Sequence, residues 1–116
     1  GENFSYFGGS TDAPDVFDSV LDAIDGWYAE SFNYDYAQPR STASEEIYHF
    51  TQMIWKSTFQ MGFGVFRNNT SKRTFVVALY NPSGNVLARP PDSFRRFRGN
   101  VTVPVKPFQP YDFSFY

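Results

Sequence analysis

The chain has 116 residues, and its 10 lysines and arginines against 12 aspartates and glutamates give a net charge of −2. That length suits one domain, and the charge gives no reason to expect a nucleic acid or an anionic membrane as partner. The sequence has no cysteine and no apolar run of membrane-spanning length, which excludes disulfides, thiolate nucleophiles, cysteine-ligated zinc and a membrane-spanning helix in these residues.

The first third of the chain predicts a strand followed by one long amphipathic helix. Residues 1–8 favour an extended entry, and a Gly-Gly-Ser-Thr turn follows. Asp12 is the expected N-cap, with Pro14 and Asp15 in the first helical turn. Apolar side chains at helical spacing carry the helix to residues 30–32: Phe17, Val20, Leu21, Ile24, Trp27 and Tyr28. The aspartates between them predict a solvated face.

The middle of the chain predicts a loop, a short helix and a hairpin. Residues 32–41 form an aromatic-rich loop, and residues 42–45 (Thr-Ala-Ser-Glu) fit a capping box that opens a helix ending near Trp55. Residues 61–67 and 73–80 predict two strands, joined by a loop at 68–72. The second strand is almost continuously apolar, which predicts that both of its faces are covered. A tight turn follows at 81–85.

The composition changes after Pro90-Pro91. Residues 92–116 mix arginines, prolines and aromatic residues without periodicity, which is typical of an extended or partly disordered tail. The predicted organisation is a folded domain over residues 1–91 and a tail over 92–116 that packs on it.

His49 is the only histidine, so every site that needs an imidazole, as a base or as a metal ligand, would depend on it. A single histidine is ordinarily a hydrogen-bonded, partly buried side chain. If Glu2 and Glu30 converge on it, two carboxylates and an imidazole would suit a divalent cation such as zinc, or an acid–base group. Spacing alone does not bring these three residues together.

Four Asn-x-Ser/Thr sequons begin at Asn3, Asn68, Asn69 and Asn100. Four such sequons at turn-like places in a chain of this length favour secretion, and they predict glycosylation at these asparagines.

Four blocks of the sequence, in this order, carry a resemblance to a known family: residues 1–4 (Gly-Glu-Asn-Phe), 26–30 (Gly-Trp-Tyr-Ala-Glu), 49–55 (His-Phe-Thr-Gln-Met-Ile-Trp) and 80–86 (Tyr-Asn-Pro-Ser-Gly-Asn-Val). Together they resemble the signature blocks of the CAP superfamily, which includes cysteine-rich secretory proteins, insect venom antigens and plant pathogenesis-related proteins. The resemblance covers residues 1 to about 90. It implies an α+β fold, a three-layer α-β-α sandwich with a small antiparallel sheet. It also implies a cleft with two histidines and two glutamates, of which Glu2, Glu30 and His49 match three.

The sequence departs from the family pattern in what it lacks. The fourth cleft residue, a histidine before the first block, and the N-terminal helices are absent, so the apolar strand at 74–80 would expose a large apolar patch. We therefore expect this chain to be the larger fragment of a cleaved precursor, with an N-terminal fragment bound non-covalently as its partner. Two alternatives are that the aromatic tail fills the gap and that a homodimer shares helices.

The function that the resemblance implies is that of a secreted, extracellular, non-enzymatic binding protein. Its ligand would be a lipid, a sterol or a protein, with a role in defence, venom or reproduction. The expected ligand loop contains Phe32, Tyr34, Tyr36 and Pro39; alternatively, its two tyrosines cap the sheet edge. A metal-dependent hydrolase using the cleft is the alternative function. A third possibility is a precursor role, in which a peptide that follows the turn at 82–86 is released and acts as a signal.

Overall fold

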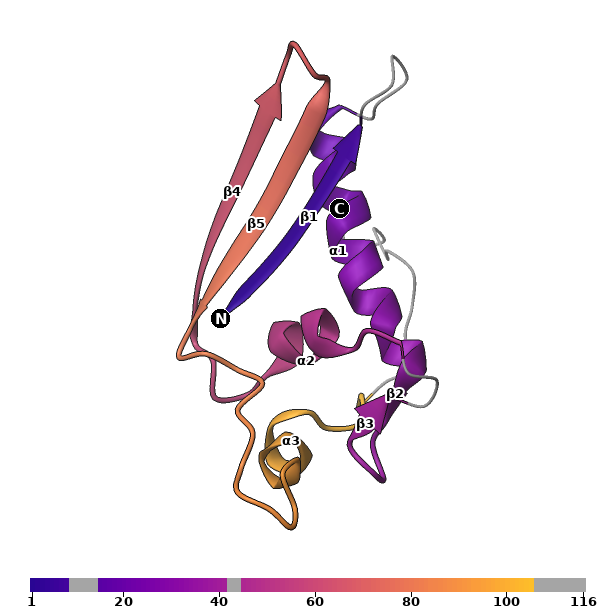
Figure 1. Cartoon of the computed structure of the whole chain (residues 1–116), viewed down its shortest axis with the longest axis vertical. Helices are drawn as coiled ribbons and strands as arrows, with labels where there is room; N and C mark the ends of the chain where they lie inside the picture. The colour runs from indigo at the N-terminus through magenta and orange to yellow at the C-terminus, as the bar shows by residue number, and fades with distance from the viewer. Residues whose placement is uncertain (9–14, 42–44, 106–116) are drawn as a thin grey trace.

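The computed structural model describes residues 1–8, 15–41 and 45–105, and it confirms the α+β fold (Figure 1). The predictions on Asp12, on the turn after Gly8, on the capping box and on residues 106–116 lie wholly or largely outside the described residues. The elements in chain order are β1 (Glu2–Gly8), α1 (Val16–Ala29), a 3-10 turn η1 (Glu30–Asn33), β2 (Tyr34–Asp35), β3 (Arg40–Ser41), α2 (Tyr48–Ile54), β4 (Gln60–Asn68), β5 (Arg73–Asn81) and α3 (Arg95–Asn100).

The sheet has three antiparallel strands in the order β1-β5-β4. Its register places Asn3 and Phe63 on either side of Ala78. Because side chains alternate along a strand, this row of residues faces one side of the sheet, while the neighbouring row through Leu79 faces the other. A separate two-stranded ladder, β2 with β3, forms within the loop expected at residues 32–41.

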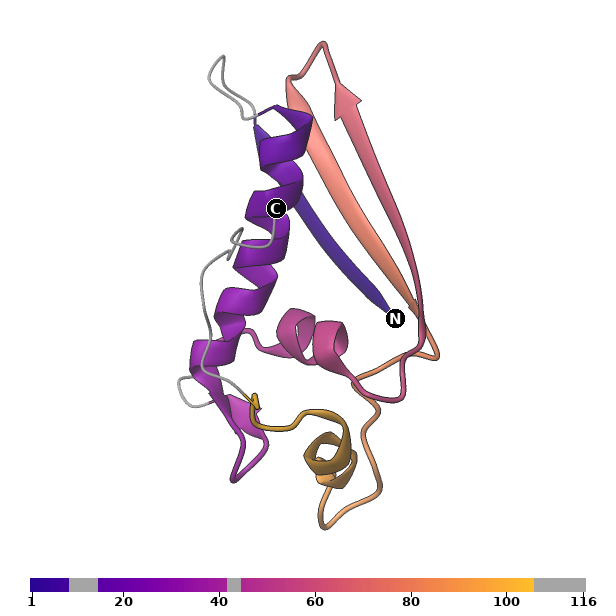
Figure 2. The ribbon, with the colours of Figure 1, turned by 180° about the vertical axis from the view of Figure 1, so that it is seen from behind.

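Helix α1 lies along the Ala78 face of the sheet (Figures 1 and 2). Its N-cap is Asp15, whose side chain accepts a hydrogen bond from the backbone N–H of Asp18 at 2.8 Å. The prediction that Asp15 lies inside the first helical turn is therefore wrong. The prediction that Phe17 belongs to the buried stripe is wrong, because its side chain is 69% exposed. The buried residues of α1 are Ser19, Ala23 and Trp27. Small side chains at two of these positions let the helix backbone approach the strands.

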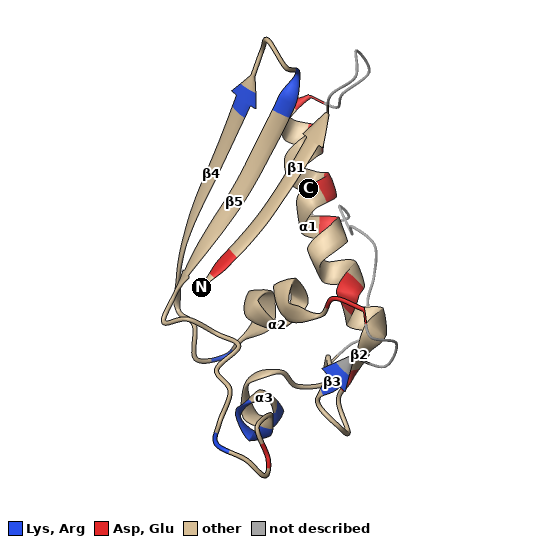
Figure 3. Cartoon of the chain, in the orientation of Figure 1, with Lys and Arg blue, Asp and Glu red and all other residues tan. Residues whose placement is uncertain are grey.

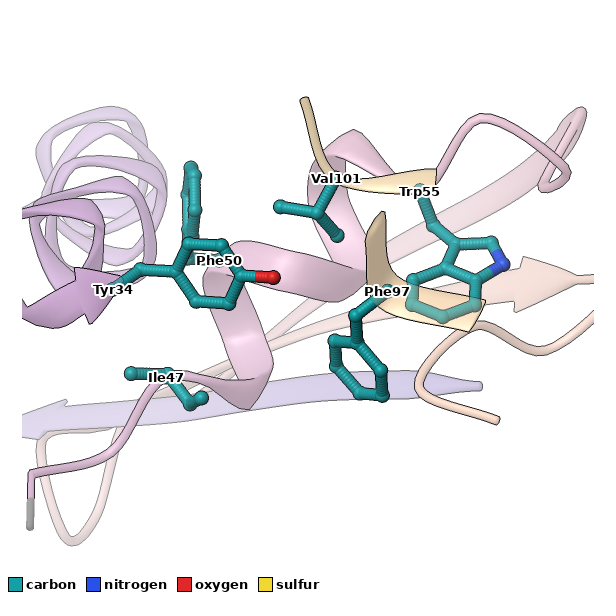
Figure 4. Close-up of a cluster of buried hydrophobic side chains, with 6 residues drawn as sticks. All are labelled: Tyr34, Ile47, Phe50, Trp55, Phe97 and Val101. Atoms are coloured by element: carbon teal, nitrogen blue, oxygen red, sulfur yellow. The ribbon is translucent and has the colours of Figure 1, made fainter. Parts of the chain in front are cut away.

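A second core cluster holds the lower half of the molecule together (Figure 4). It is built from residues of four segments: Tyr34, Ile47, Phe50, Trp55, Phe97 and Val101. The expectation of an extended chain after Pro91 is wrong for Arg95–Asn100, which forms α3. Residues 94, 97 and 101 follow a helical spacing of three and four, and burial of Phe97 against Trp55 fixes that turn. The division of the chain at residue 91 stays a prediction.

The prediction that both faces of β5 are covered is wrong within the described residues. Helices α1 and α2 both lie on the Ala78 face, and the opposite face presents a row of aromatic rings to solvent. Phe75 stacks with Phe4, Tyr6 and Phe66 at centroid distances of 6.1, 6.2 and 6.4 Å. The exposed fractions of Tyr6 and Phe66 are 60% and 63%. We call this surface, made of Phe4, Tyr6, Phe66, Phe75 and Leu79, the aromatic face.

Candidate functional site

Glu30 and His49 form the centre of the candidate site. Glu30 begins η1 directly after α1, and His49 lies in the first turn of α2. Glu30 Oε2 lies 2.8 Å from His49 Nδ1, while Oε1 accepts the backbone N–H groups of His49 at 3.0 Å and Phe50 at 3.1 Å. These are N–H groups that the first turn of a helix cannot satisfy internally, so Glu30 caps α2 from a different element.

The charge of Glu30 also governs the protonation of His49. The hydrogen bond that His49 donates to Glu30 raises the pKa of His49 above its usual 6.5. Partial burial opposes this rise, and the negative charges of Glu30 and Glu46 add to it. His49 is 32% exposed and Glu30 14%. The raised pKa favours the protonated imidazolium form of His49, which faces the Glu30 carboxylate.

Residues around this pair fix its position. The Trp27 ring stacks on the His49 ring with centroids 6.2 Å apart. Asn3 donates from Nδ2 to the His49 carbonyl at 3.0 Å and to the Tyr80 hydroxyl at 3.2 Å, which ties α2 to strands β1 and β5. Asn3 Oδ1 has no hydrogen-bond partner among the described residues.

Two further polar side chains of α2 hold the turn after β5. Gln52 accepts the backbone N–H of Gly84 at 2.9 Å, and Thr51 donates to Asn85 Oδ1. Both Thr51 and Gln52 are buried. Their hydrogen bonds are directed at the protein, so these side chains serve as structural links between α2 and the turn.

The structure brings together two of the three predicted cleft residues. Glu2 is exposed on β1, and the alternation along the strand puts its side chain on the aromatic face, away from Asn3 and α2. In its place Glu46 joins Glu30 and His49, with ligand atoms all within 4.8 Å of one another. The signal that could have found Glu46 is its position three residues before His49.

The donor types of this group suit zinc, but its geometry in this structure is that of a hydrogen-bonded pair. Two ligands on one tetrahedral zinc at about 2.0–2.1 Å would lie about 3.3 Å apart. The 2.8 Å between Glu30 Oε2 and His49 Nδ1 is shorter than that. A metal at this position would have to break that hydrogen bond or use the other ring nitrogen, Nε2.

A separate groove opens on the Ala78 side of the sheet, between the two helices and strand β4. Its volume is about 340 Å³. Its lining comes from α1, α2, β4 and β5: Val20, Ile24, Trp27, Met53, Met61, Phe63, Ala78 and Tyr80. Met61 is 62% exposed and Phe63 44%, because α1 covers β5 and leaves β4 open. Trp27 belongs to both the groove and the His49 stack.

A family comparison decides what kind of domain this is. The model of the cysteine-rich secretory protein family, CAP, matches residues 1–80. The chain belongs to the CAP family.

Curated CAP relatives match over most of this chain. Human Golgi-associated plant pathogenesis-related protein 1 is 42% identical over 85 residues, which is 73% of this chain and 50% of the relative. Venom allergen 5 of Vespa mandarinia is 34% identical over 84 residues, 71% of this chain and 40% of the relative. The chain thus spans half or less of the length of these CAP proteins.

A solved CAP structure supports the fold. The venom allergen-like protein 4 of Schistosoma mansoni aligns with a TM-score of 0.56 at 20% identity, covering 72% of this chain and 44% of that one. At this identity the match speaks for the CAP fold alone. Within the residues that the structure describes, no helix combines the length and the apolar character needed to cross a bilayer.

The loop predicted to bind a ligand is partly core in this CAP domain. Tyr34 is 5% exposed and packs edge-on against Phe50, and Pro39 is buried as well. Tyr36 packs edge-on against Tyr34 at 5.0 Å, whereas Phe32 is 78% exposed. Tyr34 is therefore a core residue of the second cluster and does not cap the edge of the sheet.

The four sequons differ in their surroundings. Asn3 is 1% exposed, so the folded chain has no room for a glycan there, and that prediction is corrected. Asn68 and Asn69 are exposed at the β4–β5 hairpin, and Asn68 accepts the N–H groups of Thr70 and Ser71. Asn100 is half-buried and donates from Nδ2 to the Arg96 carbonyl. Glycosylation at Asn68, Asn69 and Asn100 stays a prediction.

Proposed function

We propose that this CAP chain is a non-enzymatic, extracellular binding protein that takes an apolar, lipid-like ligand in the groove beside α1. The observation that carries the proposal is the groove of about 340 Å³ with an almost wholly apolar lining. Ligand pockets are typically concave and mostly apolar with a few polar groups that set orientation. The Tyr80 hydroxyl and the Trp27 indole are the polar groups available here.

Burial of exposed side chains supplies the driving force. Met61, Phe63 and Val65 face the same side of β4 and are 62%, 44% and 36% exposed. An acyl chain or sterol lying between β4 and α1 would cover Met61 and Phe63 and be covered by them. At about 25 cal/mol per Å² of apolar area, such mutual burial yields measurable affinity without any charged contact.

The experiment is a titration of the chain with a fluorescent fatty acid. Binding is measured as quenching of the emission of Trp27 and Trp55 by energy transfer to the fatty acid. Phe63→Glu places a charge in the groove. Phe66→Glu places the same charge three residues further along β4, on the opposite, aromatic face. Both residues are exposed, so both variants should fold. We expect Phe63→Glu to weaken binding about tenfold or more while Phe66→Glu leaves it nearly unchanged. Equal effects of the two variants, or no saturable binding, would overturn the proposal.

We propose as well that the aromatic face is covered in the native protein by a second polypeptide, an N-terminal fragment of the same precursor held without a covalent bond. The support is the size of the exposed apolar surface, since contiguous patches of this kind mark interfaces in soluble proteins. Mass determination on natively purified material, first native and then denaturing, tests it. A second polypeptide that separates on denaturation supports the proposal, and a mass equal to this chain alone rejects it.

A metal-dependent hydrolase is the second candidate, favoured by the Glu30, Glu46 and His49 group. Calorimetric titration with zinc, on the native chain and on His49→Ala, tests metal binding separately from activity. Zinc binding that vanishes in His49→Ala, together with a chelator-sensitive hydrolysis, would support this function. Indifference to chelator and to the substitution would reject it.

A further inference from the structure

Two arginines from distant parts of the chain line a cavity at the lower end of the molecule. Arg40 belongs to β3 and Arg98 to α3, and both border a space of about 440 Å³. Gln38, Pro39, Asp92 and Phe94 complete the lining. None of these residues contributes to the apolar groove or to the Glu30–His49 pair.

The hydrogen bonds of the two guanidinium groups leave most of their donor capacity for a ligand. Arg40 Nη2 donates to Gln38 Oε1 at 2.9 Å, and Arg98 Nη1 donates to Asp92 Oδ2. A guanidinium carries five N–H donors in a planar fork, and each of these contacts uses one. Arg98 is 52% exposed, so its remaining donors are accessible from solvent.

The charge around the cavity has one dominant sign. Arg95 and Arg96 belong to α3 together with Arg98, and Arg95 donates to the Arg89 carbonyl. This end thus holds at least five of the chain's ten basic residues although the net charge is −2 (Figure 3). Asp92 is the acidic residue among the lining residues, and Asp35 lies within electrostatic reach of Tyr34, as Arg98 does. The acidic positions of α1 lie along a different part of the ribbon (Figure 3). A cluster of positive charges makes the local electrostatic potential more positive, and it raises the local concentration of anionic ligands.

Helix stability does not explain this cluster. Arg95 and Arg96 occupy the first turn of α3, where cations oppose the helix dipole. The buried Tyr34 hydroxyl has no hydrogen-bond partner among the described residues, and it lies within electrostatic reach of Arg98. Helix stability therefore gives no reason for this placement of the arginines, and Phe94 is the aromatic residue in the lining of the cavity.

We propose that Arg40 and Arg98 form a binding site for a phosphate group, carried by a small molecule or by a lipid headgroup. The planar guanidinium matches two phosphate oxygens at once, and the fork is better suited to phosphate than a lysine is. Asp92 competes with the phosphate for Arg98, so the ligand shares or displaces that ion pair. Gln38 offers its amide N–H₂ as a neutral donor.

The test is a calorimetric or NMR titration with inorganic phosphate, and a flotation assay with phosphatidylcholine vesicles that contain a minority of phosphatidic acid. Arg40→Gln/Arg98→Gln removes both charges of the site. Lys72→Gly/Arg73→Ala removes the same charge at the β4–β5 hairpin; glycine suits position 72 because its φ is 59°. Circular dichroism of all variants checks the fold.

We expect the site variant to weaken phosphate binding about tenfold or more and the hairpin variant to change it less than about twofold. Asp92→Asn should tighten binding several-fold, because Arg98 is then released from its ion pair. If the chain binds the vesicles and free phosphate competes with that binding, the ligand is a lipid headgroup. If the chain binds phosphate but not the vesicles, the ligand is a small molecule that carries phosphate. Equal losses in both double variants, or no binding by either probe, would overturn the proposal.

Discussion

At the scale of single residues, Glu30 is the side chain with the most connections in the candidate site. It accepts hydrogen bonds from the His49 ring and from two backbone N–H groups of α2. Glu30 thus follows the last residue of α1, and its carboxylate caps α2 and raises the pKa of the only histidine. Replacing Glu30 would change both effects at once, so His49 is the cleaner position at which to measure the ion pair.

We expect the pKa of His49 to lie above 6.5 and the Glu30→Gln variant to bring it down. The folded chain then binds the proton more tightly than the unfolded chain, so the stabilisation is fully present below pH 6.5 and is lost as pH rises through the raised pKa. Relative to His49→Gln, the free energy of unfolding should be larger near pH 5.5 than near pH 9, by about 1 kcal/mol or less because the pair is partly exposed. NMR titration of the ring protons measures the pKa directly, and a native value at or below 6.5 would contradict the argument.

Gly84 gives a second prediction at this scale. A Cβ there would lie 2.7 Å from Gln52 Nε2 and 2.9 Å from Trp55 Cγ, whereas a Cβ at Gly62 meets nothing within 4 Å. We expect Gly84→Ala to lower the free energy of unfolding by about 1–3 kcal/mol and Gly62→Ala to leave it nearly unchanged. Urea unfolding of both variants measures the difference; equal stability would show that the turn after β5 shifts freely.

At the scale of elements, the unexpected finding is that α3 completes a core. Phe97 is 0% exposed and meets Trp55 edge-on at 4.9 Å, while Lys56 donates its backbone N–H to the Asn100 carbonyl at 3.1 Å. The segment after Pro91 is thus part of the packing around α2. A short helix with three arginines would be unstable alone, so its conformation depends on this burial.

We expect Phe97→Ala to destabilise the chain by about 3–5 kcal/mol, because it leaves a cavity beside Trp55. Arg96→Ala in the same helix should change stability by less than about 0.5 kcal/mol. Tryptophan fluorescence during urea unfolding measures both. If Phe97→Ala fails to fold, Phe97→Leu, with a smaller expected loss of stability, serves in its place. A loss of stability as small for the Phe97 variant as for Arg96→Ala would mean that α3 does not anchor the core.

The elements with a strong local pattern were predictable from the sequence. The strand-forming residues of β4 and β5, the apolar spacing of α1 and the signature blocks led to the correct fold class and to the Glu30–His49 pairing. The exposure of Phe17 could not be predicted, because helical spacing identifies an apolar stripe but does not show which of its residues face the core. The sequence also did not show that Glu46, and not Glu2, lies beside His49. The face of the sheet on which the Glu2 side chain lies is known only once the pairing of β1 is known. Helix α3 was missed because it contains three arginines and a single buried apolar residue, Phe97.

At the scale of the whole molecule, the arrangement is one-sided. Helices α1 and α2 pack on one face of the sheet, and α3 lies beyond its end (Figures 1 and 2). The described residues thus form two layers of the sandwich expected for CAP proteins, and the aromatic face is where a third layer would lie.

We expect the isolated chain to self-associate through this face. Phe66→Thr/Leu79→Thr removes two of its exposed apolar side chains, which are 63% and 52% exposed, and should shift the chain towards monomer. Leu87→Thr is the matched control, because Leu87 is 56% exposed outside the sheet. Sedimentation velocity over a range of concentrations measures the change. Association that persists in the double variant, or that Leu87→Thr abolishes equally, would place the contact elsewhere.

The register of the sheet also has a consequence for the order of folding. Strand β1 pairs with β5 across most of the sequence, from Glu2 with Leu79 to Gly8 with Arg73, whereas β4 and β5 are joined by a short hairpin. Closing the long loop costs more chain entropy, so the β4–β5 hairpin should form early and strand β1 should dock late. Pulse-labelled hydrogen exchange would then protect β4–β5 amides before those of β1. Until β1 docks, Val76 and Ala78 have one strand neighbour instead of two, and the newborn chain exposes its most apolar strand to any other extended peptide nearby.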